Sequence, residues 1–84
     1  MKVHLDPATK RILLAILASP KTPKEVSQIH GIPVIVVWQK IRRLEELGIA
    51  REVLAFVSAT GELRRYFEAE LPTDTSDEEL TIEA

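Results

Sequence analysis

The sequence predicts a small, mainly helical domain that ends in a β-hairpin. Two stretches, 7–19 and 34–47, space their apolar residues as amphipathic helices do. Between them lies a short segment with a strong helix start at Thr22 and a stop at Gly31. After Gly48 the apolar period changes to two, which is typical of strands.

Length and composition restrict the possible functions. A chain of 84 residues holds one domain with a modest core, so we expect no enzyme and no catalytic residues. There is no cysteine, which excludes disulfides and thiolate metal sites and fits a cytoplasmic location. His4 and His30 make a weak ligand set, so we expect no metal and no cofactor. The longest apolar run, 12–18, is too short to span a membrane.

The first helix is expected over residues 7–19. Asp6 can accept the free amides of the first turn, and Pro7 has no amide to leave unpaired. Ser19 and Pro20 end the helix. Its apolar face is predicted to comprise Ile12, Leu13, Ile16 and Leu17.

The second helix is short, and its start is marked by a capping box. Thr22 and Glu25 have the spacing for reciprocal hydrogen bonds, and Pro23 stands at the first helical position. Gly31 ends the helix by adopting a left-handed conformation. We expect the apolar residues Val26 and Ile29 to face the core.

The third helix, 34–47, begins with four β-branched residues that locally favour a strand. Glycines on either side and apolar residues at 37, 41, 44 and 47 favour a helix instead. On that helix Ile35 and Trp38 are predicted to face outward, with no core to fill.

The remaining chain is predicted to form a hairpin and a tail. Residues 51–57 and 63–71 alternate as strands, and a turn joins them at 58–61. Residues 1–67 hold eleven lysines and arginines against six acids, a net charge of +5, whereas 68–84 hold seven acids and no base. We therefore expect a domain over 1–71 and an acidic, disordered tail over 72–84, which either improves solubility or competes with a polyanion for the basic surface.

This order of elements resembles the winged helix-turn-helix proteins, and most of all the ArsR, MarR and TrmB types of transcription regulator. Two segments carry the resemblance: TPKEVSQIHGIPVIVVWQKIRRLEELGIAREV, and TGELRRYF, which is similar to the family's wing. The resemblance implies three helices with a two- or three-stranded wing. It also implies a cytoplasmic regulator that binds double-stranded DNA as a homodimer, with no membrane partner and no evident small-molecule effector.

In such proteins the outward face of the third helix enters the major groove, and the resemblance implies roles for its residues. Gln39 would pair with adenine, Arg42 with guanine or a phosphate, and Ile35 with a thymine methyl group. Trp38 would pack along the sugar-phosphate edge or donate its indole N–H, and Arg43 lies on the flank of the same face.

Other cations would bind the DNA backbone. Lys21, Thr22 and Lys24 stand at the start of the second helix, where phosphates are readily bound. Arg64 and Arg65 in the wing would meet phosphate or the minor groove, although strand alternation turns one of them the other way.

A second interpretation stays open at the sequence level. Exposed apolar side chains such as Ile35 and Trp38 also mark protein contacts, so the domain could be a protein-interaction module. The basic residues could also form a solvated face, with Arg42 and Arg43 pairing with Glu45 and Glu46 at helical spacing.

Overall fold

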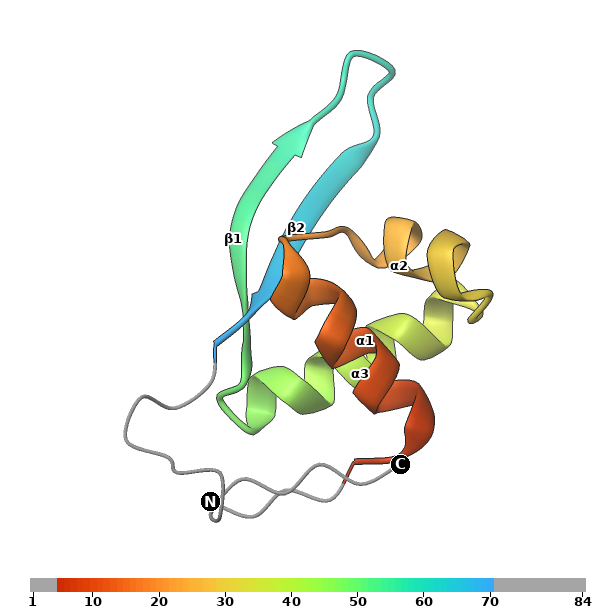
Figure 1. The fold of residues 1–84 in the computed structure, drawn as a ribbon. Coiled ribbons are helices and arrows are strands. Elements are labelled where there is room, and N and C mark those ends of the chain that lie inside the picture. The colour runs from red at the N-terminus through yellow and green to blue at the C-terminus, as the bar shows by residue number, and fades with distance from the viewer. Residues whose placement is uncertain (1–4, 71–84) are drawn as a thin grey trace.

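The computed structural model describes residues 5–70, which form three helices followed by an antiparallel hairpin (Figure 1). This arrangement confirms the predicted fold class, a mainly helical winged helix-turn-helix layout. The hairpin extends well beyond the helices, with its turn at the far end. Residues 1–4 and 71–84 lie outside the described part, and with them the tail predicted from residue 72. The elements are α1 (Pro7–Ala18), α2 (Pro23–His30), α3 (Val34–Glu46), β1 (Ala50–Val57) and β2 (Leu63–Ala69).

Asp6 caps α1 as predicted and also ties that helix to α3. Its Oδ1 accepts a hydrogen bond from the Thr9 amide at 2.7 Å, and its Oδ2 lies 2.6 Å from Lys40 Nζ. The hydrogen bonds from Lys40 and Thr9 lower the pKa of Asp6 from 3.8 to about 2. One carboxylate therefore fixes both the start of α1 and the packing of α1 on α3.

The capping box of α2 is present with both of its hydrogen bonds. The Glu25 amide donates to Thr22 Oγ1 at 3.1 Å, and the Thr22 amide donates to Glu25 Oε1 at 2.9 Å. Gly31 then ends the helix with φ of 65°, a left-handed conformation that costs glycine little. Local sequence signals determine both ends of this short helix.

The core gathers side chains from every element, and Phe67 of β2 is its largest fully buried residue. Lys21 and Phe67 exchange two backbone hydrogen bonds, of 3.0 and 2.9 Å, which join the segment before α2 to the free edge of β2. The sheet of the wing is therefore two-stranded with one additional bridge. The buried apolar residues are Leu5, Ile12, Leu13, Ala15, Ile16, Val26, Val37, Ile41, Leu44, Ile49, Ala50 and Phe67.

Two residues predicted for the core are exposed. Leu17 is 46% exposed and Ile29 is 61% exposed. At 100° per residue, each lies about 90° from the centre of the buried face of its own helix. Both residues lie beside the buried face and are not part of it. The spacing of apolar residues alone does not distinguish these two positions.

The hairpin has an irregular register that strand alternation did not predict. Glu52 pairs with Phe67 and Leu54 pairs with Tyr66, which leaves Val53 as the extra residue of a bulge. Beyond the bulge, Ala55 stands opposite Arg65 and Phe56 opposite Arg64.

Within residues 5–70, no helix has the length and the apolar composition that a membrane span requires.

Candidate nucleic-acid interface

A groove of about 710 Å³ separates the start of α2 and the first turns of α3 from the tip of the hairpin. Three cationic and two acidic side chains line the groove. Some of the lining residues were predicted to bind DNA, and others were not. The charged lining residues are Lys24, Glu25, Glu62, Arg64 and Arg65. The groove thus brings together the helix-turn-helix unit and the wing, which are distant in the sequence.

The outward face of α3 is open to solvent. Ile35 is 67% exposed, and Gln39 and Arg42 are also exposed. These three side chains form a face that presents one apolar group, one amide and one guanidinium. An amide and a guanidinium are the groups that read adenine and guanine in the major groove.

The cations of α3 differ in their partners. Lys40 is bound to Asp6, and Arg43 Nη1 lies 3.6 Å from Glu46 Oε2. Of the two pairings that helical spacing allows, the ion pair of Arg43 with Glu46 is present, whereas within residues 5–70 no ion pair joins Arg42 to an acid. Arg42 is therefore the α3 cation best placed to meet an external anion.

Arg65 is the wing arginine that turns toward the helices. Its guanidinium lies 5.0 Å from the ring centre of Trp38 and 5.5 Å from that of Phe67, and its Nε donates to Glu52. The hydrogen bond to Glu52 raises the pKa of Arg65 above its ordinary value. Arg65 thus contacts both strands of the wing and Trp38 of α3.

Trp38 also has a different environment from the one predicted. It was expected on the outward face with no core to fill, but its ring packs edge-on against Phe67 with the centroids 5.6 Å apart. The outward position of Trp38 was predicted from the helical spacing of α3 alone. Phe67 and Arg65 both come from β2, so that spacing could not show their contact with Trp38. Of the predicted apolar pair, only Ile35 stands fully outside the packed structure.

Lys21 and Thr22 are largely engaged in local structure. Lys21 Nζ donates to the Ala15 carbonyl at 2.7 Å and to Ser19 Oγ at 2.9 Å, near the end of α1. Thr22 is 7% exposed, and its hydroxyl accepts the Glu25 amide. These contacts occupy the groups that a phosphate would otherwise use.

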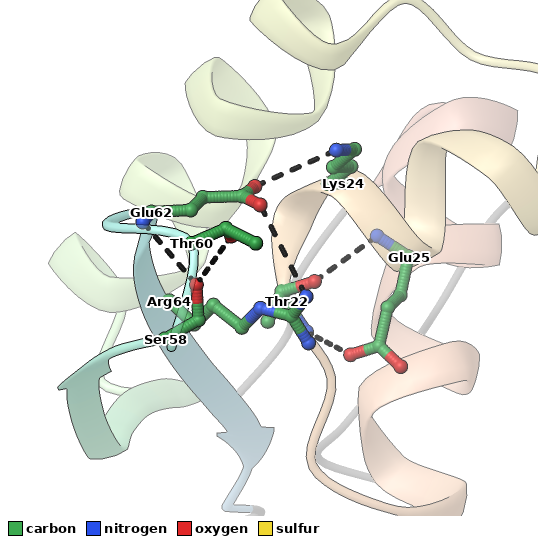
Figure 2. A network of polar contacts seen from close by, with 7 residues as sticks. All are labelled: Thr22, Lys24, Glu25, Ser58, Thr60, Glu62 and Arg64. Carbon is green, nitrogen blue, oxygen red and sulfur yellow. Dashed lines mark hydrogen bonds and ion pairs between the residues drawn. The ribbon is translucent and has the colours of Figure 1, made fainter.

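Lys24 and Arg64, in contrast, extend into the groove and face the same carboxylate (Figure 2). Glu62 Oε1 lies 3.5 Å from Lys24 Nζ, and Glu62 Oε2 lies 4.0 Å from Arg64 Nη2. No pattern in the sequence predicted a role for Glu62. The sequence shows that Glu62 directly follows the turn glycine. It does not show that Glu62 meets Lys24, because Lys24 stands 38 residues earlier in the chain.

Other kinds of site find no support in the described part of the chain. Within residues 5–70 no three side chains of histidine, aspartate or glutamate gather as a set that could hold a metal ion. The groove lining holds no histidine, and its threonine hydroxyl is used as a helix cap. The exposed side chains of this interface that could bind a ligand are cationic and amide groups.

Comparison with known proteins points in the same direction. No protein-family model matches the chain. The chain is similar to the HTH-type transcriptional regulator FL11 of Pyrococcus abyssi (strain GE5 / Orsay), with 32% identity over 59 residues. The matched segment covers 69% of this chain but 39% of that relative, so the chain spans about two fifths of the relative's length. The similarity agrees with the helix-turn-helix layout and does not distinguish the ArsR, MarR and TrmB types.

Proposed function

We propose that this chain is a DNA-binding transcriptional regulator that inserts α3 into the major groove of double-stranded DNA and uses the hairpin as a wing. One observation carries the proposal: the groove places Val34 and Trp38 of α3 together with Lys24 of α2 and Arg64 of β2. Ile35 and Gln39, which could contact bases, directly follow Val34 and Trp38 on α3, next to the groove cations that could bind phosphates. The layout of the fold and the similarity to an HTH-type regulator support the same function.

The base contacts are assigned to the outward face of α3. Arg42 would bind guanine through its two parallel donors, and Gln39 would bind adenine through its amide. Ile35 would contact a thymine methyl group, because it is the most exposed large apolar residue of this helix. These contacts would give sequence preference.

The phosphate contacts are assigned to Lys24, Arg43 and Arg64, whose side chains are exposed. Arg65 and Trp38 would act indirectly, since their mutual packing fixes the angle between the wing and α3. These contacts would set the register and orientation of the domain on DNA.

The regulator would act as a homodimer in the cytoplasm. A single helix-turn-helix unit contacts few bases, and useful affinity commonly comes from two half-sites about one helical turn apart. No small-molecule effector is included in the proposal.

The experiment is selection of bound sequences from random duplex DNA, followed by titration of the enriched site. Arg42→Ala should weaken binding to that site by roughly 1–3 kcal/mol while the fold is retained. Arg51→Ala is the matched control, because Arg51 pairs with Glu68 at the end of the hairpin away from the turn. Failure to enrich any sequence, together with capture of a protein partner that Ile35→Ala abolishes, would favour the protein-interaction module.

A further inference from the structure

The structure assigns a second role to the groove, which rests on the proposed function: we propose that Glu62 occupies the place of a DNA phosphate and thereby limits the affinity for DNA. The carboxylate stands at the tip of the wing, between the two groove cations that would bind the DNA backbone (Figure 2). DNA must either displace it or accept its charge beside a phosphate.

The turn of the hairpin holds the backbone of Glu62 in place. The Ser58 amide donates to the Glu62 carbonyl at 2.8 Å, and the Glu62 amide donates to Ser58 Oγ at 3.2 Å. Gly61, with φ of 84°, closes the turn through its own hydrogen bond to the Ser58 carbonyl. These hydrogen bonds hold the Glu62 backbone in a position from which its side chain reaches Lys24 of α2.

The carboxylate of Glu62 bridges two elements. One oxygen faces Lys24 of α2 and the other faces Arg64 of β2, at 3.5 and 4.0 Å. A phosphate presents the same combination, a negative charge spread over several acceptor oxygens, to lysine and arginine donors. Glu62 thus meets the cations in the way that a DNA phosphate would.

The bridge is weak enough to be replaced. The side chains of Lys24, Glu62 and Arg64 are 63%, 42% and 46% exposed, and ion pairs with such exposure contribute little to stability. Glu25, the other acid of the groove lining, is committed to the cap of α2. Of the two acids that line the groove, Glu62 is therefore the one whose side chain faces the cations Lys24 and Arg64.

The test is titration of a short duplex of mixed sequence with the wild-type chain and with Glu62→Gln, which keeps the shape and removes the charge. One unit charge about 5 Å from a phosphate in water corresponds to roughly a fourfold change in affinity per wing. We therefore expect Glu62→Gln to bind roughly fourfold tighter at low salt, with the gain shrinking as salt screens the charge.

Glu68→Gln is the matched control. It removes one negative charge from the same hairpin, but Glu68 pairs with Arg51 and not with a groove cation. Its affinity should stay near that of the wild type. An equal gain in both variants would reduce the effect to net charge and overturn the proposal, and so would weaker binding by Glu62→Gln.

The test also separates the failure of this inference from failure of the proposed function. Wild-type binding that Glu62→Gln leaves unchanged would overturn the inference alone. Absence of DNA binding by both chains at low salt would overturn the proposed function and the inference with it. Melting curves of both variants establish that the compared proteins are folded.

Discussion

At the scale of single residues, Trp38 shows how a side chain can leave the face predicted for it. On the helix it lies about 90° from the line of Val37, Ile41 and Leu44, so spacing predicts exposure. In the structure the rings of Trp38 and Phe67 pack in a T-shaped arrangement, and the Arg65 guanidinium lies over the Trp38 ring. The sequence could not reveal this, because the covering residues belong to a different element whose register contains a bulge.

Trp38→Ala should therefore destabilise the fold, by about 2 kcal/mol from the loss of buried apolar area. Trp38→Phe should recover most of the loss, since it keeps a ring against Phe67. Chemical denaturation measures the free energy of unfolding in both cases. Ile35→Ala is the control and should change stability by less than about 0.5 kcal/mol, because its side chain is exposed. Equal effects at the two positions would contradict the packing described for Trp38.

The two wing arginines show the same limit of sequence reasoning. Alternation predicted that one of them would turn away from the other, but it could not choose between them. Both arginines line the groove, but Arg65 lies over the rings of Phe67 and Trp38, whereas Arg64 faces Glu62. The choice depends on which face of the hairpin meets the helices, and that is a property of the assembled fold.

At the scale of elements, the helices were the most predictable part. Asp6, the box of Thr22 and Glu25, and Gly31 act within one turn of the chain, and each appears as predicted. Burial was less predictable, because Leu17 and Ile29 lie beside the buried faces of their helices. End signals are local, whereas burial depends on where the next element packs.

The cap of α1 gives a pH dependence with a definite sign. The pKa of Asp6 is lowered to about 2 in the folded chain from an ordinary 3.8, so its ionised form favours folding. This contribution is fully present above the ordinary value and is lost as the pH falls through the folded value. The melting temperature of the wild type should fall between about pH 4 and pH 2.

Asp6→Asn should remove this component, because the amide oxygen still caps α1 but carries no charge for Lys40. Its melting temperature should depend less on pH over the same range, with salt reducing the difference since the pair is partly exposed. Asp6→Ala should cost about 1 kcal/mol at neutral pH through loss of the cap. Identical pH profiles for the wild type and Asp6→Asn would show that the Lys40 contact does not stabilise the fold.

At the scale of the whole molecule, the sequence predicted the fold class and several of the groove cations. Lys24 and Arg64 were predicted from helix and turn signals to bind the DNA backbone, and both line the groove. It did not predict Glu62 between them, since a contact across 38 residues depends on how the wing folds back toward α2. The candidate site is thus a set of locally predictable side chains joined by an unpredicted contact.

The dependence of DNA affinity on salt tests whether one side of this domain binds DNA phosphates. If about four phosphates are neutralised per subunit, log K should fall against log salt with a slope of about −3.6, or about −7 for a dimer. A steep, linear decrease of this size is the expected result. A flat dependence, or no binding to duplex DNA at low salt, would show that this side of the domain does not bind DNA phosphates.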